Sequence, residues 1–197
     1  MIERILTYIY VCKKSLFQIV LLISFAASLN TKAFAMPNVE TAFTSVIFQS
    51  HEDNDLRLDK YKGKIIVLFF GYSHCPDICP TTLLDISRAI NHLGNDADRI
   101  QPIFISVDYK RDTPKSLAQY TSYFNERILG ITSDKKNIDK ITKFFKTSYA
   151  LLDHQSKNYL VEHSSNIYII DQNFIVQRII SNGLPYLEIT KAIKNLF

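Results

Sequence analysis

Two cysteines four positions apart, Cys75 and Cys79, are the residues whose types and spacing most directly suggest chemistry. They lie in the stretch GYSHCPDICP, between a continuous apolar run at residues 64–71 and a segment from Thr82 with apolar residues at helical spacing. A junction from a buried strand to a helix is where α/β sheets commonly bind ligands. The partial positive charge and free N–H groups at a helix start also stabilise thiolates.

Two such thiolates have two uses: they exchange disulfides, or they hold a soft metal ion. Three residues separate this pair, whereas dithiol oxidoreductases of the thioredoxin type have two, and the wider loop suits a metal at least as well as a tight disulfide. Two cysteines with one histidine fall short of the four ligands of structural zinc but suit copper, whose reduced ion favours sulfur and accepts low coordination numbers. The plainest alternative is a disulfide that only stabilises an exported domain.

The segments that would position the cysteines alternate between strand and helix. Continuous apolar runs indicate buried strands, and apolar residues three or four apart indicate helices packed on one face. The order predicts an α/β fold, a central mixed sheet flanked by helices, with its antiparallel part near the C-terminus. We expect strands at residues 44–49, 64–71, 102–107, 127–132, 159–161, 166–170 and 174–179, and helices at residues 82–93, 114–124, 137–149 and 184–197.

The run at residues 64–71 is predicted to be the central strand, because it has no polar residue between its flanking Lys and Gly. The helix that follows the cysteines should pack on the sheet through Leu83, Ile86 and Ile90, and Gly94 is a plausible stop. An exposed edge position for this strand would leave the cysteine loop without its scaffold.

Residues 1–35 are expected to be a signal peptide or an N-terminal membrane anchor. Three bases and one acid precede an uncharged apolar run at residues 16–29, and the small-residue pattern of a cleavage site ends at Ala35. As a helix this run would rise only about 21 Å, short of a hydrocarbon core of about 30 Å. We therefore favour cleavage before Met36, leaving one exported domain at residues 36–197.

Export across the inner membrane follows from this leader, either into the periplasm or to a membrane-anchored position facing it. The leader also explains the basic pI. It holds four of the 23 bases and one of the 19 acids, so the rest of the chain carries a net charge of about +1. A near-neutral domain has no electrostatic footprint for nucleic acid. We expect membrane contact only through the N-terminal segment.

Four ordered motifs carry a resemblance that reaches from about residue 60 to the C-terminus. They are FFGYSHCPDICPTTL, SVDYKRDTP, ILGITS and YLVEHSSNIYIID. Together they resemble the Sco/SenC family of copper-binding, thioredoxin-fold proteins of cytochrome c oxidase assembly. The resemblance implies a thioredoxin-like fold and a copper ion held by Cys75, Cys79 and His163.

The sequence departs from the family pattern in three places, none of which touches these three residues. Glu162 stands where the family commonly has Asp, the segment before Gly63 lacks a Gly-rich strand opening, and the turn at residues 171–173 lacks the usual Gly. The first changes the residue beside His163, and the second makes an N-terminal hairpin less expected.

Two functions from different classes fit this set. The first is a copper chaperone that delivers copper to a cuproenzyme; by resemblance, the recipient is the dinuclear copper centre of cytochrome c oxidase subunit II, or another cuproprotein. The alternative is a thiol–disulfide oxidoreductase that keeps the copper-ligand cysteines of a partner reduced, with Cys75 attacking and Cys79 resolving. Metal retention needs His163, whereas disulfide exchange does not. A peroxidase is disfavoured because no Thr stands at the expected place before Cys75.

Other polar residues are assigned plainer roles. Taken alone, a histidine between two strands such as His163 would be structural, and only the family pattern makes it a ligand. His74 is not expected to bind the metal, because neighbouring residues on a loop usually diverge. Asp108 is placed near the mouth of the site, where it would tune the charge or receive a partner. Asp112 is assigned to turn and cap chemistry ahead of Pro114.

Overall fold

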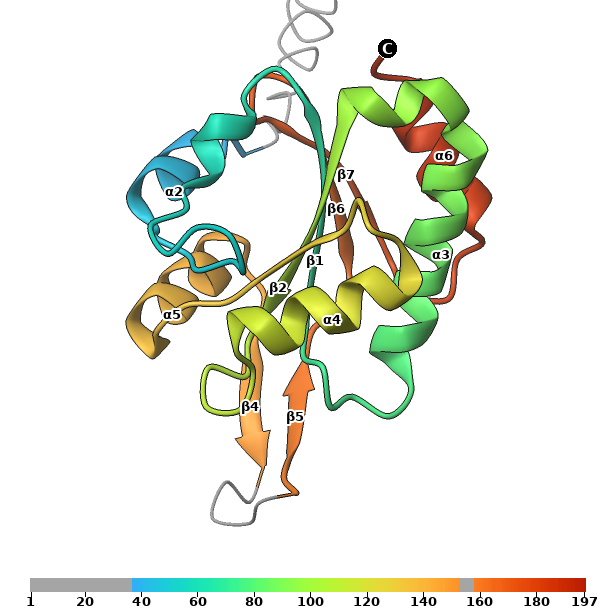
Figure 1. The fold of residues 1–197 in the computed structure, drawn as a ribbon. Helices are drawn as coiled ribbons and strands as arrows, with labels where there is room; N and C mark the ends of the chain where they lie inside the picture. Colours follow the sequence, from blue (N-terminus) through green and yellow to red (C-terminus); the bar gives the residue numbers. More distant parts are fainter. Residues whose placement is uncertain (1–36, 153–157) are drawn as a thin grey trace, which may run out of the picture. The chain divides into compact units, whose positions relative to one another are not determined.

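The computed structural model describes residues 37–152 and 158–197 (Figure 1). The predicted leader at residues 1–35 lies outside this range. In the part of the chain that is described, no helix combines the length and the apolar character needed to span a bilayer. The helices are α2 (Glu40–Ser45), α3 (Ile78–Leu93), α4 (Pro114–Phe124), α5 (Lys135–Phe144) and α6 (Tyr186–Lys194), with 3₁₀ turns η1 (Leu58–Tyr61) and η2 (Gly94–Arg99).

A five-stranded mixed sheet forms the centre of the fold, as predicted. Its strand order is β3-β2-β1-β6-β7; β1 pairs in parallel with β2 and antiparallel with β6. The parallel side continues to β3 and the antiparallel side to β7. The strands are β1 (Ile65–Gly71), β2 (Ile100–Ser106), β3 (Leu129–Ile131), β6 (Ile167–Ile170) and β7 (Val176–Ile180).

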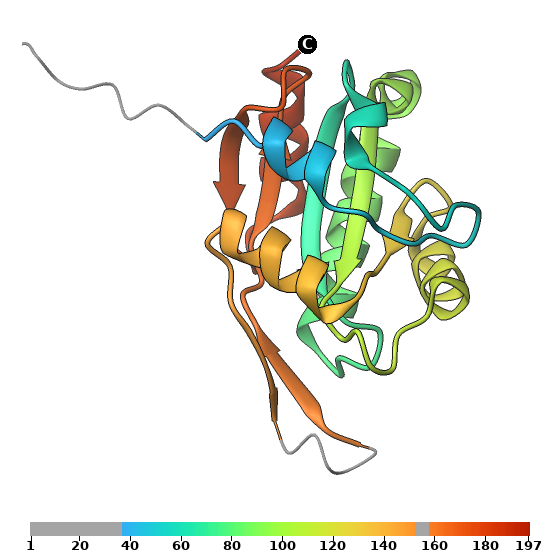
Figure 2. The same cartoon turned by 90° about the vertical axis from the view of Figure 1, so that its left-hand side faces the viewer.

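Helices cover both faces of this sheet, so its middle strands are buried on both sides. Figures 1 and 2 show α2 and α5 over one face and α3 and α6 over the other, with α4 beside β3. All seven residues of β1 are buried, which explains why its sequence is apolar without alternation. The prediction of a central strand at residues 64–71 is confirmed.

Helix α3 begins earlier than its apolar periodicity indicated. It starts at Ile78, so Cys79 lies within the first helical turn and Pro80 occupies a position where no N–H is needed. The face turned to the core includes Leu83, Ile86 and Ile90, as expected. Gly94 ends the helix with a φ of 57°, a conformation that favours glycine.

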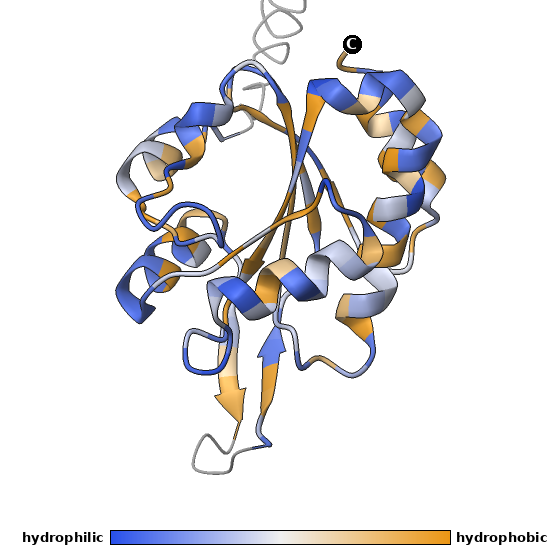
Figure 3. Cartoon of the chain, viewed as in Figure 1, coloured by the Kyte–Doolittle hydropathy of each residue, from blue (hydrophilic) through white to orange (hydrophobic). Residues whose placement is uncertain are grey.

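A separate pair of strands carries the histidine of the fourth motif. Strands β4 (Tyr149–Leu152) and β5 (Leu160–His163) form their own antiparallel sheet, in which Tyr149 pairs with His163. Figures 1 and 2 show this pair extending past the end of the central sheet, and Figure 3 shows β4 as largely apolar. His163 is therefore the last residue of a hairpin and not part of the central sheet.

Two predictions differ from the structure: one expected strand is absent, and one expected helix ends early. Residues 44–49 were expected to be a strand, but α2 continues to Ser45, and Phe48 and Gln49 form only isolated bridges. The helix expected at residues 137–149 ends at Phe144, and Tyr149 begins β4. In each case tertiary pairing outweighs local preference.

The turn at residues 171–173 contains no glycine and is stabilised by side-chain hydrogen bonds. Asp171 Oδ1 accepts hydrogen bonds from the backbone N–H groups of Asn173 and Ile175, both at 2.9 Å. The left-handed conformation is adopted by Phe174, with a φ of 63°, and its ring is fully buried against Phe43. Burial of an aromatic ring stabilises this turn where the family pattern has a small residue.

Candidate metal centre

Cys75, Cys79 and His163 are brought together at one end of the central sheet. One ligand atom from each, two sulfurs and an imidazole nitrogen, lies within 4.8 Å of the others. His163 Nε2 is 3.3 Å from Cys79 Sγ, and the Cys79 backbone N–H points to Cys75 Sγ at 3.5 Å. Both thiols are free, with Cys79 buried and Cys75 half-buried.

The sheet topology explains how residues 84 positions apart meet. Strand β1 ends at Gly71, and the cysteine loop follows directly. Strand β6 runs antiparallel to β1 with Phe69 opposite Ile167, so the beginning of β6 lies beside the end of β1. His163, a few residues before β6, is therefore delivered to the same end of the sheet as the cysteines.

Gly71 makes room for the buried sulfur. A Cβ atom at this position would lie 2.8 Å from Cys79 Sγ and 2.6 Å from Cε2 of Phe104. Real Cβ atoms essentially never approach other heavy atoms so closely, and Phe104 is fully buried and has no free direction to move. The glycine at the end of β1 is thus required by the close approach of the first turn of α3.

The imidazole of His163 is oriented by one hydrogen bond and two aromatic rings. Its Nδ1 lies 3.0 Å from the carbonyl oxygen of Ser164, which only accepts, so Nδ1 carries the proton in the neutral ring. The lone pair of Nε2 then faces Cys79 Sγ. Tyr72 and Phe69 contact the ring edge-on, with centroids 5.7 and 6.3 Å away. This is the arrangement expected of a metal-binding histidine.

The two thiols differ strongly in acidity because the Cys79 thiol donates a hydrogen bond to the Cys75 sulfur. The hydrogen bond from the Cys79 side chain, followed by those from the backbone N–H groups of Asp77 and Cys79, lowers the pKa of Cys75 to about 4 despite burial. The same hydrogen bond, together with burial, raises the pKa of Cys79 above its usual range. At neutral pH the metal-free protein therefore presents one thiolate and one thiol.

The acidity of Cys75 predicts a reactivity that hardly changes with pH. A thiol with a pKa lowered to about 4 is already ionised above that pH, so iodoacetamide should alkylate Cys75 at a nearly constant rate from about pH 6 to about pH 8. An unperturbed thiol would react about tenfold faster for each pH unit in this range. Mass spectrometry of the Cys75 peptide measures the rate.

Cys79→Ala is the informative comparison for this measurement, because it removes the largest cause of the shift. In that variant the pKa of Cys75 should rise and the rate should again depend on pH. A tenfold increase in the parent between about pH 7 and about pH 8 would show that Cys75 is an ordinary thiol.

The structure assigns other polar residues differently from the sequence analysis. Asp108 is fully buried, so the expectation that it receives a partner at an open mouth is wrong. Asp112 was assigned to cap chemistry, but Thr113 caps α4, and the Asp112 carboxylate instead accepts hydrogen bonds from Ser73 and Ser106. Nothing in the local sequence signals the contact with Ser73, because Ser73 is 39 residues away.

His74 stays outside the metal-ligand group, as expected. Its Nδ1 lies 3.0 Å from Ser73 Oγ and 3.5 Å from Asp112 Oδ1, and its side chain is half exposed. Among the described residues, the group of potential ligand atoms consists of Cys75, Cys79 and His163 alone. Two thiolates and one neutral imidazole match the low coordination number and sulfur preference of Cu(I) and fall one ligand short of a structural zinc site.

A thioredoxin-like fold with a cysteine pair at a strand-to-helix junction and a histidine from a hairpin defines the class of this protein. The family model described as SCO1/SenC matches residues 35–197, and the chain belongs to that family. A curated relative, the SCO2-like protein RC0895 of Rickettsia conorii, is 39% identical over 117 residues. That alignment covers 58% of this chain and 57% of the relative, so the chain spans little more than half of the relative's length.

Several solved structures with the same fold contain copper. Bradyrhizobium japonicum ScoI with copper bound matches with a TM-score of 0.71 and 30% identity, covering 77% of this chain and 97% of that chain. Yeast Sco1 with copper bound matches with a TM-score of 0.70 and 26% identity, over 76% and 84% of the two chains. These matches confirm the thioredoxin-like fold and support copper as the ligand of the family.

Proposed function

We propose that this protein is a copper chaperone whose cargo is held by Cys75, Cys79 and His163. The observation that carries the proposal is the convergence of two sulfurs and one correctly oriented imidazole nitrogen within 4.8 Å. The copper-bound relatives from Bradyrhizobium japonicum and yeast support copper as the cargo. Metal binding is favoured over disulfide exchange as the main function, because Cys79 and the histidine ring are already arranged around one position.

The neutral histidine ligand and the burial of Cys79 support an order of ligand exchange. Binding of Cu(I) replaces the proton of the Cys79 thiol, while Cys75 is already a thiolate. During transfer, a partner's thiolate displaces the neutral His163 first, then Cys75, and the buried Cys79 sulfur leaves last. Copper keeps its oxidation state throughout, so the transfer needs no electron donor.

The recipient we propose is the dinuclear copper centre of cytochrome c oxidase subunit II, or another cuproprotein. The support is membership of the SCO1/SenC family. We further propose that residues 1–35 direct export, and that residues 36–197 act in the periplasm or at the membrane facing it. N-terminal sequencing of the exported protein should begin at Met36; retention of residues 16–29 would identify an anchor instead.

Anaerobic titration with Cu(I) tests the chaperone function directly. The reduced protein should bind one copper ion per chain in competition with a Cu(I) chelator, and loaded protein should pass copper to a soluble subunit II domain. Protein oxidised to the Cys75–Cys79 disulfide is the control and should bind none, because a disulfide has no thiolate to donate. Equal binding by the reduced and oxidised forms would refute a thiolate site.

The acidity of Cys75 favours a second candidate function, thiol–disulfide exchange with the copper-ligand cysteines of a partner. An accessible thiolate beside a buried thiol is the usual arrangement of an attacking and a resolving cysteine. In this reaction Cys75 would form a mixed disulfide, and Cys79 would release the reduced partner while the pair itself becomes oxidised. Reduction of a disulfide in the recipient domain without added copper would establish this activity.

A further inference from the structure

The β2–α4 loop, residues 107–113, contacts both halves of the candidate metal centre. We propose that its buried carboxylates, Asp112 and Asp108, are positioning residues that fix the distance between the cysteine loop and His163. The proposal rests on the copper-binding function above. It identifies residues outside the ligand set that would hold the ligands at the right distance from one another.

On the cysteine side, Asp112 holds the residue two positions before Cys75. Its carboxylate accepts hydrogen bonds from the backbone N–H of Ser73 at 2.9 Å and from the Ser73 hydroxyl. A third hydrogen bond comes from the hydroxyl of Ser106, the last residue of β2, at 2.5 Å. The Asp112 side chain is 0% exposed, so these bonds form away from competing water.

On the histidine side, Asp108 and Arg111 hold Tyr159, the residue directly before β5. The Tyr159 hydroxyl donates to Asp108 Oδ1 at 2.5 Å, and Arg111 Nε donates to Asp108 Oδ2 at 2.5 Å. Arg111 also donates from Nη1 to the Tyr159 carbonyl oxygen at 2.8 Å, and its guanidinium carbon lies 3.6 Å from the centre of the tyrosine ring. Backbone, ring and hydroxyl of Tyr159 are all fixed by one loop.

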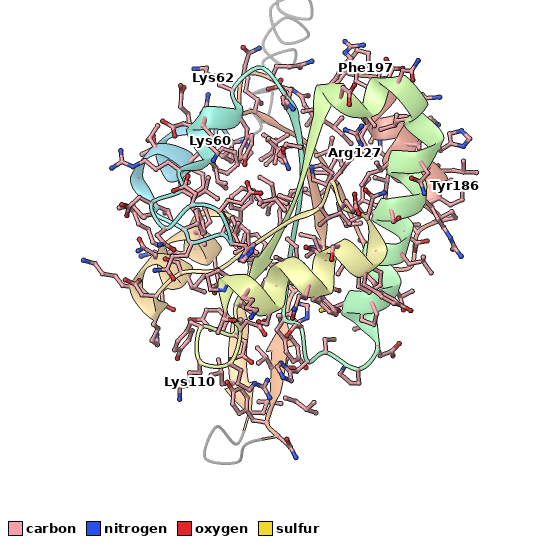
Figure 4. All side chains as sticks on the ribbon, viewed as in Figure 1. Lys60, Lys62, Lys110, Arg127, Tyr186 and Phe197 are labelled. Carbon is pink, nitrogen blue, oxygen red and sulfur yellow. The ribbon has the colours of Figure 1, made fainter. Side chains whose placement is uncertain are left out.

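This attachment is needed because the β4–β5 pair has no ladder to the central sheet. The central sheet sets the position of the cysteine loop through β1 and of the residues after His163 through β6, but none of its strands pairs with β4 or β5. The β2–α4 loop ties the start of β5 to the central sheet, since the loop's own start is fixed by β2. By contrast, Lys110 lies between the two carboxylates in sequence and points away from the body (Figure 4).

Buried charged groups are costly unless they are paired and hydrogen-bonded, so a buried ion pair is weak evidence of a stabilising role. Here the two carboxylates stand four residues apart and serve different segments, one before Cys75 and one before β5. A purely stabilising role would not require both segments to belong to one site. The shared loop therefore indicates a role in positioning.

Tyr159→Phe tests the histidine side with the smallest change, because it keeps the ring and removes only the hydroxyl. We expect copper retention to weaken about tenfold, the low end of the effect seen when a group that orients a ligand is lost. In a His163→Ala background the same change should have no further effect, since its influence acts through His163. Tyr123→Phe is the matched control, because Tyr123 is 86% exposed.

Asp112→Asn tests the cysteine side, and unlike Tyr159→Phe it should not depend on His163. Its effect on copper retention should persist in the His163→Ala background, because it acts through the loop that carries Cys75. Lys110→Ala, in the same loop but exposed, should leave retention unchanged. If Tyr159→Phe reduced copper retention equally with and without His163, the assignment of the histidine side would be overturned. Unchanged copper retention in Tyr159→Phe alone would overturn it as well. If Asp112→Asn had no effect on copper retention in the His163→Ala background, the role of Asp112 on the cysteine side would be overturned.

A copper-free measurement separates this proposal from the chaperone function. In the metal-free protein, Tyr159→Phe should speed hydrogen exchange in β4 and β5 and leave exchange in β1 unchanged. If the parent binds no copper, the chaperone function fails, and this exchange pattern alone decides whether the loop positions the hairpin. Unchanged exchange in both strands would refute the positioning role whatever the copper result.

Discussion

Replacing His163 with alanine should weaken copper retention by about 10- to 100-fold or more, because loss of a ligand costs at least as much as loss of a group that orients one. The variant keeps both sulfurs, so it should still bind Cu(I) weakly with two ligands. Disulfide exchange by Cys75 and Cys79 should remain largely intact. Competition with a Cu(I) chelator measures the first effect, and reduction of a disulfide substrate measures the second.

His92→Ala is the appropriate control for this variant. His92 is exposed and lies on α3, the helix that also carries Cys79, so it reports any general binding of copper to surface imidazole. It should retain copper as the parent does. If His163→Ala bound Cu(I) and Cu(II) as tightly as the parent, the three-ligand site would be wrong, and the reductase function would take first place.

Gly71→Ala should both destabilise the fold and displace the Cys79 sulfur. The added methyl would meet Phe104 at 2.6 Å and Cys79 Sγ at 2.8 Å. Overpacking of this kind costs about 1–3 kcal/mol of unfolding free energy. Because the Phe104 ring is fully buried, part of the strain should be relieved by moving the first turn of α3, which weakens copper retention as well. Denaturant unfolding and chelator competition measure the two effects.

Gly130→Ala provides a matched loss of stability away from the sulfurs. A Cβ atom there would lie 2.8 Å from the backbone oxygen of Leu117, so this variant should also be destabilised. Its folded fraction should nevertheless bind copper as tightly as the parent. Unchanged copper retention in Gly71→Ala, or an equal loss in Gly130→Ala, would contradict the specific role of Gly71.

The central elements of the fold could be predicted because their sequences allow few alternatives. The run that forms β1 is apolar throughout, and α4 was predicted at its observed bounds because Thr113 and Pro114 mark its start. The cysteine pair was recognised from its place between a strand and a helix. His163 belongs to the candidate ligand group by family resemblance alone, since its approach to the cysteines depends on the antiparallel pairing of β1 and β6.

What could not be predicted depends on partners distant in the sequence. Strand β4 is four residues long and exists only because β5 pairs with it, so its sequence carries little independent signal. The carboxylates of Asp108 and Asp112 resemble ordinary turn residues until Tyr159 and Ser73 are placed beside them. Local patterns describe periodicity and capping, but they do not identify the partner of a buried charge.

The antiparallel pairing of β1 with β6 also determines in which folding states the three candidate ligands are close together. A chain in which β6 is not paired with β1 offers two thiols without the imidazole, because this pairing brings His163 beside Cys79. A metal held by all three residues therefore binds the completed fold and not its precursors. Such binding stabilises the folded state by mass action, by about 4 kcal/mol when the free metal concentration is about 1,000 times the dissociation constant. Metal loading thus selects molecules that have finished folding.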